Sequence, residues 1–463
     1  MKRVLLVACL AVFLAGCTVG PKYQRPQAAL PQSWRAPAPA TSSIGNLKWW
    51  TLFRDPVLQR LIHAALDQNK DLLLAASRVD QAQGALAVRR SDQFPHVSIG
   101  ASAVEERLSR VGAFPFPPSF NVTLPLYTLQ PQISYEADFW GQYRQATAAA
   151  RSQLLATEEA RKNVEVSVVS SVAQSYFTLL QLDRELQITQ QTVATFKDSV
   201  KLTRIRSQGG VASDLDVRQA ETELDSAAAL IPALERQIGQ EEDAIGILLG
   251  RNPDGIPRGS ALTAQPLPPS VPAGLPSALL ERRPDIAQAE DQLKAAYAET
   301  GVAKAQFYPQ LALTGSGGFE SSMLSKFVSG PALIWEAAAD LTAPIFTAGE
   351  LRGNLRVARA EQQQALITYR QTVQEALREV DDSLIGYQKT LEQRRSDETL
   401  VADSEKALRL ANVRYGNGVA TYLDVLDSER TFLNSQLSLA QTQGNTLVSV
   451  VQLYKALGGG WQP

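Results

Sequence analysis

Apolar residues recur every seven positions along four long segments of the chain. The first segment, 140–206, contains no proline and no glycine except Gly141. The apolar series of the four segments start at Val172, Val217, Leu366 and Val425. Such a repeat keeps one apolar seam facing a partner helix. The pattern therefore predicts long supercoiled helices, the first of them about 100 Å long if unbroken.

The same short sequence appears twice, as RSQGGVASDLDV at 206–217 and RYGNGVATYLDV at 414–425. Seven of its positions are identical at an offset of 208, and the apolar series after the two copies differ by the same offset. Gly210 and Gly418 suit the end of a helix, and Ser213 and Thr421 suit the cap of the next. We therefore expect two antiparallel coiled-coil hairpins, each reversing at one copy.

The Pro-rich stretch 251–275 divides the chain into two similar halves. On this basis we expect a first structural repeat at 49–250, the linker at 251–275, a second repeat at 276–457 and a tail at 458–463.

Each half also predicts two β-strands, because apolar and polar residues alternate around 97–103, 133–139, 311–313 and 335–341. This alternation fits a half-buried soluble hairpin or a lipid-facing barrel wall. Pro125 and Pro131 predict a bulge or bend in the second strand. The acidic residues of the polar face would line a wet lumen in the barrel interpretation: Glu136, Asp138, Glu336 and Asp340.

The N-terminus predicts export. Two basic residues precede an apolar run from Val4 to Leu14, too short to span a bilayer but typical of a signal peptide at 1–16. The run ends in LAGC at 14–17, which resembles the bacterial lipoprotein box and predicts lipidation of Cys17; an ordinary signal peptide is the alternative. Thr18 favours the outer membrane, and residues 17–48 are expected to form an extended tether.

Composition weakens two other functional classes. The formal net charge is −2 and no basic run appears, which argues against nucleic-acid binding. Only His63 and His96 are histidines, and no HExxH or GxSxG motif is present. We therefore expect no enzyme, no catalytic residue, no metal site and no cofactor beyond the covalent lipid on Cys17.

A series of motifs resembles the TolC-like outer-membrane efflux channels, in the lipoprotein branch that works with proton-driven pumps of the resistance-nodulation-division class. The motifs are LAGCTVGPKYQRP at 14–26, WWTLFRDPVLQRLI at 49–62, SYEADFWGQYR at 134–144, LLERRPDIAQAE at 279–290, GVAKAQFYPQLALTG at 301–315 and LGGGW at 457–461. Ala348 and Glu350 depart from the family, where Gly and Arg are often found.

The resemblance implies a mainly α fold with a small β part. Four strands from each of three protomers would form a 12-stranded barrel in the outer membrane, above a hollow α-helical barrel that crosses the periplasm. The 251–275 stretch would lie in an equatorial region. The implied function is a passive exit duct for drugs or other toxic small molecules. Implied partners are a periplasmic adaptor and an inner-membrane transporter. A type I protein-secretion channel and a non-conducting envelope-spanning coiled-coil lipoprotein are the alternatives.

The resemblance also implies two sets of site residues. An aperture gate would be formed by Leu423, Asp427 and Arg430, although Asp427 and Arg430 could also form an ordinary pair within one helix. The adaptor would contact the two turns of the hairpins through Arg206, Gly210, Val211, Ala212, Ser213, Leu215, Asp216, Arg414, Gly418, Val419, Ala420, Thr421 and Asp424.

Overall fold

The computed structural model describes residues 18–27, 30–35, 54–112, 116–267, 274 and 276–459. The predicted signal peptide and Cys17 lie outside these residues. The chain divides into two compact units. Unit 1 contains Met1–Pro26, Val79–Ala156 and Ala289–Tyr369, and unit 2 contains Gln27–Arg78, Thr157–Gln288 and Arg370–Pro463. Each unit takes segments from both halves of the sequence, and the sequence-based segment boundaries stay a prediction.

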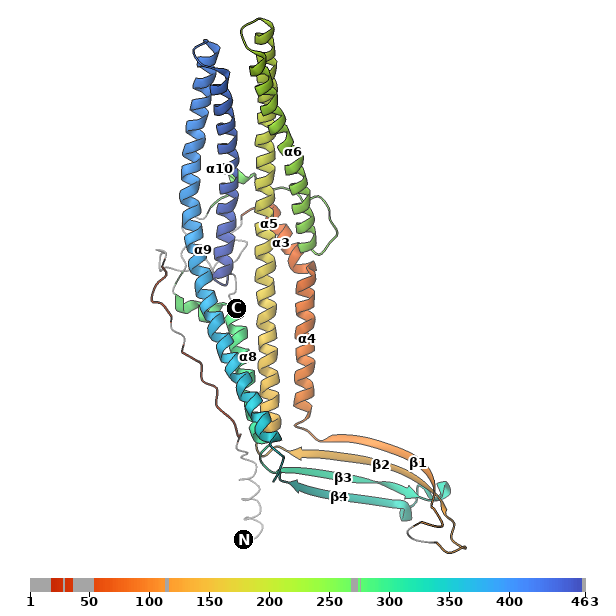
Figure 1. The fold of residues 1–463 in the computed structure, drawn as a ribbon. Coiled ribbons are helices and arrows are strands. Elements are labelled where there is room, and N and C mark those ends of the chain that lie inside the picture. Colours follow the sequence, from red (N-terminus) through yellow and green to blue (C-terminus); the bar gives the residue numbers. More distant parts are fainter. Residues whose placement is uncertain are drawn as a thin grey trace. The chain divides into compact units, whose positions relative to one another are not determined.

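The long helices confirm the internal duplication (Figure 1). Helices α5 (Gln142–Gln208) and α9 (Glu350–Gly416) both contain 67 residues, and α6 (Asp214–Leu248) and α10 (Tyr422–Ala456) both contain 35. The bounds of α5 and α6 reappear 208 residues later as those of α9 and α10. The remaining helices are α3 (Pro56–Gln68), α4 (Lys70–Ser91), α7 (Leu279–Arg282), α8 (Pro284–Ala305), and the 3-10 turns Leu262–Ala264, Pro276–Ala278, Leu324–Lys326 and Gly330–Ala332. Among the described residues, no helix is long and apolar enough to cross a membrane.

Unit 1 carries the four predicted strands as one antiparallel sheet in the order β1-β2-β3-β4. The strands are β1 (His96–Arg107), β2 (Thr123–Ala137), β3 (Gln310–Ser321) and β4 (Leu333–Thr342). Figure 1 shows β1 and β4 at opposite edges of this sheet. Both helix-to-strand junctions, at His96 and Gln310, lie at the same end, which we call the base of the sheet.

The register places odd-numbered residues of all four strands on one face. Val97 pairs with Ile133, Ile133 with Gly315, and Gly315 with Ala337. Large apolar side chains on this face are exposed, with 71% of Val97 and 78% of Trp335 accessible. Even-numbered positions form a second face that is mostly small and polar.

The predicted bulge at Pro125 and Pro131 is wrong. Strands β1 and β2 pair in one continuous register, with Glu105 opposite Pro125 and Ile99 opposite Pro131. The two prolines are six residues apart, so both lack their N–H on the same side of the strand, the side facing β3. The β2–β3 ladder is interrupted there, because no pairing occurs between Leu129 and Gln132, but its register resumes unchanged. A proline on the side of β2 that faces β3 therefore costs ladder bonds without inserting a residue.

The strand-to-helix stretch before α9 has an unusual local backbone. Ala348 has a φ of 49°, the only positive φ outside glycine among the described residues, and Gly349 follows with 90°. A residue with a Cβ is strained by roughly 1 kcal/mol in this conformation. The glycine common in the family would remove that strain.

In unit 2 the two hairpins pack against each other along their apolar seams. One buried cluster joins α5, α6 and α10 through Phe196, Ala227 and Leu433. A second cluster, nearer the turns, joins all four long helices through Val200, Ala220, Ala411 and Val425. The seven-residue apolar repeat therefore forms the core of this unit, as the sequence predicts.

Candidate functional site

The two repeated turns have the same backbone construction. Gly210 and Gly418 have φ angles of 75° and 74°, the left-handed conformation that favours glycine. In the first turn the N–H of Val211 donates to the carbonyl of Arg206 (2.9 Å); in the second, the N–H of Val419 donates to that of Arg414 (3.0 Å). These bonds satisfy helix-end carbonyls as in a Schellman motif. The glycine identities in the repeat follow from this geometry.

Asp216 and Asp424 close the caps of the return helices. Asp216 and Ser213 exchange backbone and side-chain hydrogen bonds at 2.9 and 3.2 Å. Asp424 accepts bonds from the hydroxyl and the N–H of Thr421 at 2.8 and 2.9 Å, and these bonds lower the pKa of its carboxyl. Since both carboxylates serve the caps, their identity in the repeat has a local structural cause.

Once the residues that form the turns and caps are set aside, each copy of the repeated sequence still contains two exposed apolar residues at the tip of its hairpin. The exposed fractions are 73% for Val211, 64% for Leu215, 65% for Val419 and 59% for Leu423. No turn or cap requires these side chains. By contrast, Val217 and Val425 point inward and are buried. The repeat thus presents the same two apolar residues to the outside at each tip.

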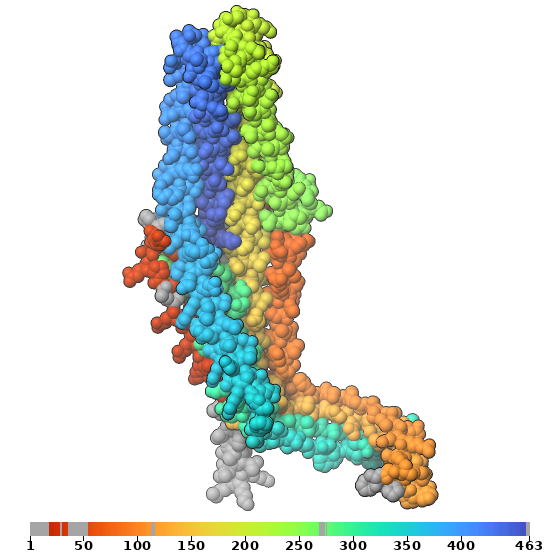
Figure 2. All heavy atoms as spheres, in the orientation of Figure 1, coloured from red at the N-terminus to blue at the C-terminus, as the bar shows by residue number. Residues whose placement is uncertain are grey.

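The two tips lie against each other (Figure 2). The guanidinium carbon of Arg206 lies 4.5 Å from the centre of the Tyr415 ring, and this ring is 5.3 Å from that of Tyr422. Arg206, predicted to contact a partner, therefore also joins the first tip to the second. Its counterpart Arg414 instead lines a groove of about 530 Å³ together with Ala420, Leu423, Asp424 and Asp427.

The predicted gate residues share one exposed face of α10. Arg430 donates to Asp427 at 3.1 Å, and 57% and 71% of the two side chains are accessible. Within one protomer they form the intrahelical pair, which contributes at most a few tenths of a kcal/mol. Any ring of such pairs requires further copies of the chain.

Glu429 lies close to these residues and was missed at the sequence level. Only 4% of it is exposed, and it accepts a hydrogen bond from the Ser199 hydroxyl at 3.0 Å, which joins α10 to α5. Burial raises the pKa of this carboxyl, the Ser199 bond opposes that rise, and Glu223 adds to it. Its counterpart Glu221 is paired with Arg204 and Arg218 instead. The repeat offset could have drawn attention to this difference, but not to the burial.

Three of the four predicted acidic residues lie on the even-numbered face of the sheet. Glu136 and Asp340 occupy one row, both paired through Ala312, and Glu336 lies on β4 opposite Ser316. Glu136 also accepts a bond from the Tyr143 hydroxyl at 2.7 Å.

Asp138 is placed elsewhere, because β2 ends at Ala137. Its carboxylate accepts the Arg144 N–H at 2.9 Å and pairs with the Arg144 guanidinium at 3.3 Å. Its position one residue past the strand lets it satisfy a backbone donor in the first turn of α5. The alternation predicted for β2 did not anticipate this helix start.

No group of three or more potential metal ligands comes together in the part of the chain that the structure describes. His63 lies exposed on α3, and His96 is the first residue of β1.

Comparison with known proteins gives a consistent result. The model of the family described as outer membrane efflux protein matches residues 61–251 and 275–459. The antibiotic efflux pump outer membrane protein ArpC of Pseudomonas putida is 35% identical over 99% of this chain and 96% of its own length. The probable outer membrane lipoprotein SilC of Salmonella typhimurium is 31% identical over the whole of both chains. The open-state crystal structure of the Neisseria gonorrhoeae MtrE outer membrane channel is 30% identical, with a TM-score of 0.88 over 96% of this chain and 98% of that one.

Proposed function

We propose that this chain, which belongs to the outer membrane efflux protein family, forms a homotrimeric duct that takes small toxic molecules from a periplasmic adaptor to the cell exterior. It is an outer-membrane efflux channel with the mainly helical fold of that family. The family is one of transport channels, which sets it apart from enzymes and from non-conducting tethers. The energy would come from an inner-membrane transporter, so the duct itself is passive.

The unpaired edges of the sheet support the trimer. Within the described residues, β1 and β4 each pair on one side only. Four strands cannot enclose a lumen, since the smallest membrane barrels have about eight. Three copies joined β1 to β4 would give 12 strands, with the exposed Val97 and Trp335 side toward lipid and the polar side toward water.

Aromatic side chains at both ends of the sheet support its placement across a membrane. At the base, Phe94 and Phe346 are 56% and 88% exposed. At the other end, Phe116 stacks on Phe120 at 4.8 Å and Phe319 lies 6.4 Å from Phe327. Aromatic residues at two levels typically mark the two interfaces of a membrane barrel.

We propose that the lipid on Cys17 enters the membrane at this same base. The N–H of Val19 donates to the carbonyl of Trp140 at 3.1 Å. Thr18 packs so closely on Gly141 that an added Cβ would clash with its methyl group. The residue after Cys17 is therefore fixed beside the β2–α5 junction. Mass spectrometry of the mature N-terminal peptide would test the modification: a free thiol would exclude it.

The exposed apolar pairs at the tips are the observation that carries the adaptor interface. The names of the efflux relatives favour small molecules over secreted proteins as cargo. The gate of Leu423, Asp427 and Arg430 and the acidic lumen of Glu136, Glu336 and Asp340 complete the proposal.

Replacing Val211, Leu215 and Val419 by serine tests the interface, and Leu423 stays unchanged because it belongs to the proposed gate. We expect capture of the cognate adaptor to fall by about tenfold or more, because buried apolar anchors dominate interface energy, and we expect the cells to lose efflux-dependent drug resistance. The Ile247→Ser variant is the matched control, since Ile247 is also 65% exposed but lies at the opposite end of α6. Full adaptor binding by the tip variant would refute the interface.

A further inference from the structure

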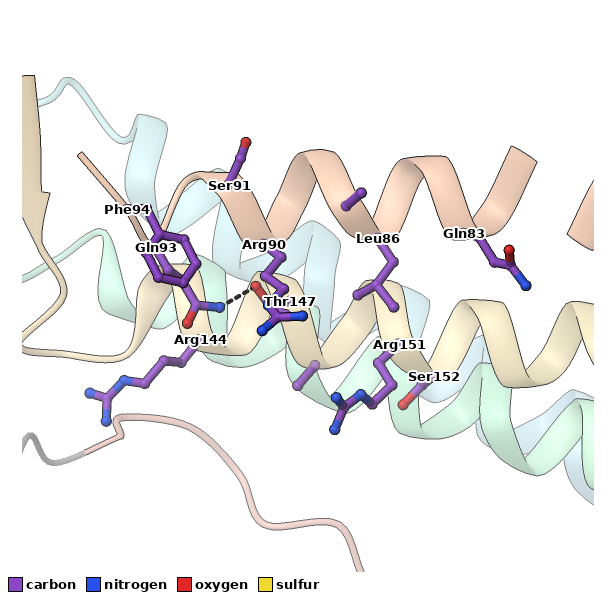
Figure 3. Close-up of a pocket in the computed structure, with 12 residues that line it drawn as sticks. Gln83, Leu86, Arg90, Ser91, Gln93, Phe94, Arg144, Thr147, Arg151 and Ser152 are labelled. Carbon is purple, nitrogen blue, oxygen red and sulfur yellow. Dashed lines mark hydrogen bonds between the residues drawn. The ribbon is translucent and has the colours of Figure 1, made fainter. Parts of the chain in front are cut away.

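Unit 1 contains a groove between α4 and the start of α5 that the duct function does not use (Figure 3). Its volume is about 840 Å³. On α4 it is lined by residues of one helical face, Gln83, Leu86, Ala87 and Arg90. On α5 it is lined by Arg144, Thr147, Ala148 and Arg151, which also share one face because seven residues make two turns.

The charge of the groove is positive, although the chain as a whole carries −2. Three arginines line it, and none of its lining residues is acidic. Arg144 is paired with Asp138. Neither Arg90 nor Arg151 forms an ion pair with any residue that the structure describes. Two of the guanidinium groups that line the groove therefore have no ion-pair partner among the described residues.

Hydrogen bonds hold the two walls of the groove together. Gln93 donates from its amide to the hydroxyl of Thr147, and this hydroxyl donates to the carbonyl of Arg89 at 3.1 Å (Figure 3). The end of α4 is therefore fixed to α5, and the arginines project from a framed site. Pre-organised guanidinium groups bind phosphate with paired hydrogen bonds.

The position of the groove limits what can occupy it. Arg90 lies six residues before the first residue of β1, and Arg144 lies seven residues after the last residue of β2. Phe94, at the end of the groove nearest the sheet, is 56% exposed. With the strands crossing the membrane as proposed above, the groove opens at the headgroup level of the inner leaflet.

We propose that this groove binds the phosphate headgroup of an anionic inner-leaflet glycerophospholipid. Arg90 and Arg151 hold the phosphate, and Phe94 and Leu86 contact the first part of the acyl chains. Each protomer would carry one such lipid, which fixes the α4–β1 junction at the membrane surface.

Native mass spectrometry of the full-length protein in detergent tests the site, with palmitoyl-oleoyl phosphatidylglycerol as the probe. We expect the Arg90→Gln/Arg151→Gln variant to bind this lipid about 20-fold more weakly than the wild type, because each arginine near an anionic lipid contributes severalfold in affinity. The Arg89→Gln variant is the control, since Arg89 lies on the same turn of α4 but does not line the groove. Unchanged lipid binding by the control supports the site.

Four results would overturn it. An equal loss of lipid affinity in the double variant and in the Arg89→Gln control would show unspecific attraction to positive charge. Unchanged affinity in both variants would show that the lipid binds elsewhere. If the Arg90→Gln/Arg151→Gln variant becomes monomeric but still binds lipid, the groove is a contact surface for a neighbouring protomer. Equally tight binding of sn-glycerol 3-phosphate would assign it to a soluble anion. Planar-bilayer conductance of the wild-type protein, measured in parallel, tests the duct function separately.

Discussion

At the residue scale, one buried carboxylate organises the start of unit 2. Asp55 is 2% exposed and caps α3 by accepting the N–H of Val57 at 2.8 Å. Its other oxygen accepts bonds from the Tyr176 hydroxyl, the Ser260 N–H and the Gln265 amide at 3.0, 3.0 and 2.8 Å. Burial tends to raise the pKa of Asp55, but these bonds together outweigh it and leave the pKa below its usual range. One side chain thus connects α3, α5 and the linker.

We predict that Asp55→Asn lowers the unfolding midpoint by about 5 °C, because an amide cannot accept all of these donors. A carboxyl whose pKa is lowered on folding stabilises the fold above its unfolded pKa of about 3.9 and loses this contribution as the pH falls through the folded value. The difference between variant and wild type should therefore be full at pH 7 and shrink below about pH 4. Circular dichroism melts in detergent measure it. Asp67→Asn, at an exposed position of α3, is the control, and equal midpoints for the two variants would contradict the prediction.

Single residues differ in how far the sequence predicts them. The caps at Ser213 and Thr421 were predictable because every atom involved lies within a few residues. Asp55 and Glu429 were not, because their burial depends on partners 121 and 230 residues away. Asp138 was assigned to the sheet because alternation gives no signal for the residue at which a strand ends.

At the scale of elements, the periods of the apolar residues and the offset between the two halves predicted most of the structure. The seven-residue repeat predicted the four long helices, the alternation predicted the strands, and the offset of 208 linked the bounds of the long helices. The prediction of a bulge at Pro125 and Pro131 was wrong because the sequence does not tell which neighbouring strand each N–H of β2 faces. The missing N–H groups of these prolines face the β3 side, where the ladder simply skips a pair.

The exposed pair on α10 leads to a prediction about gating. Alone, Asp427 and Arg430 contribute almost nothing to stability. If copies meet at the tip, cross-linking ion pairs would hold the aperture closed, so Asp427→Ala with Arg430→Ala should raise single-channel conductance in planar bilayers. Asp403→Ala with Lys406→Ala removes an equally exposed pair from α9 and should leave conductance unchanged. Identical conductance in both double variants would place the constriction elsewhere.

The acidic face of the sheet leads to a prediction about selectivity. Carboxylates around a water-filled lumen attract cations. Replacing Glu336 by Gln and Asp340 by Asn should therefore lower the cation selectivity. The reversal potential measured in a salt gradient should shift toward zero. Glu105→Gln, which removes one carboxylate from the odd-numbered face of β1, is the control. An unshifted potential in the first variant would show that this face does not line the conducting path.

At the scale of the whole molecule, the sheet is the part that one chain leaves unfinished. Its two edges are unpaired within the described residues, and its odd-numbered face exposes residues as large as Trp335. An exposed sheet edge pairs readily with another strand. In the proposed trimer, joining β1 of one copy to β4 of the next would satisfy both edges and enclose the acidic face.

Cross-linking of the two edges tests this closure most directly, because the sequence contains no cysteine after Cys17. A variant with Ser102→Cys on β1 and Ala338→Cys on β4, both on the even-numbered face, is treated in native outer membranes with a bismaleimide about 10 Å long, enough to span two adjacent strands. Closure predicts covalent dimers and trimers for the double variant and only monomers for each single variant. Because the register between copies is not known in advance, Ser102→Cys is also combined with Glu336→Cys and with Asp340→Cys. Monomers alone from all three double variants would contradict a shared barrel.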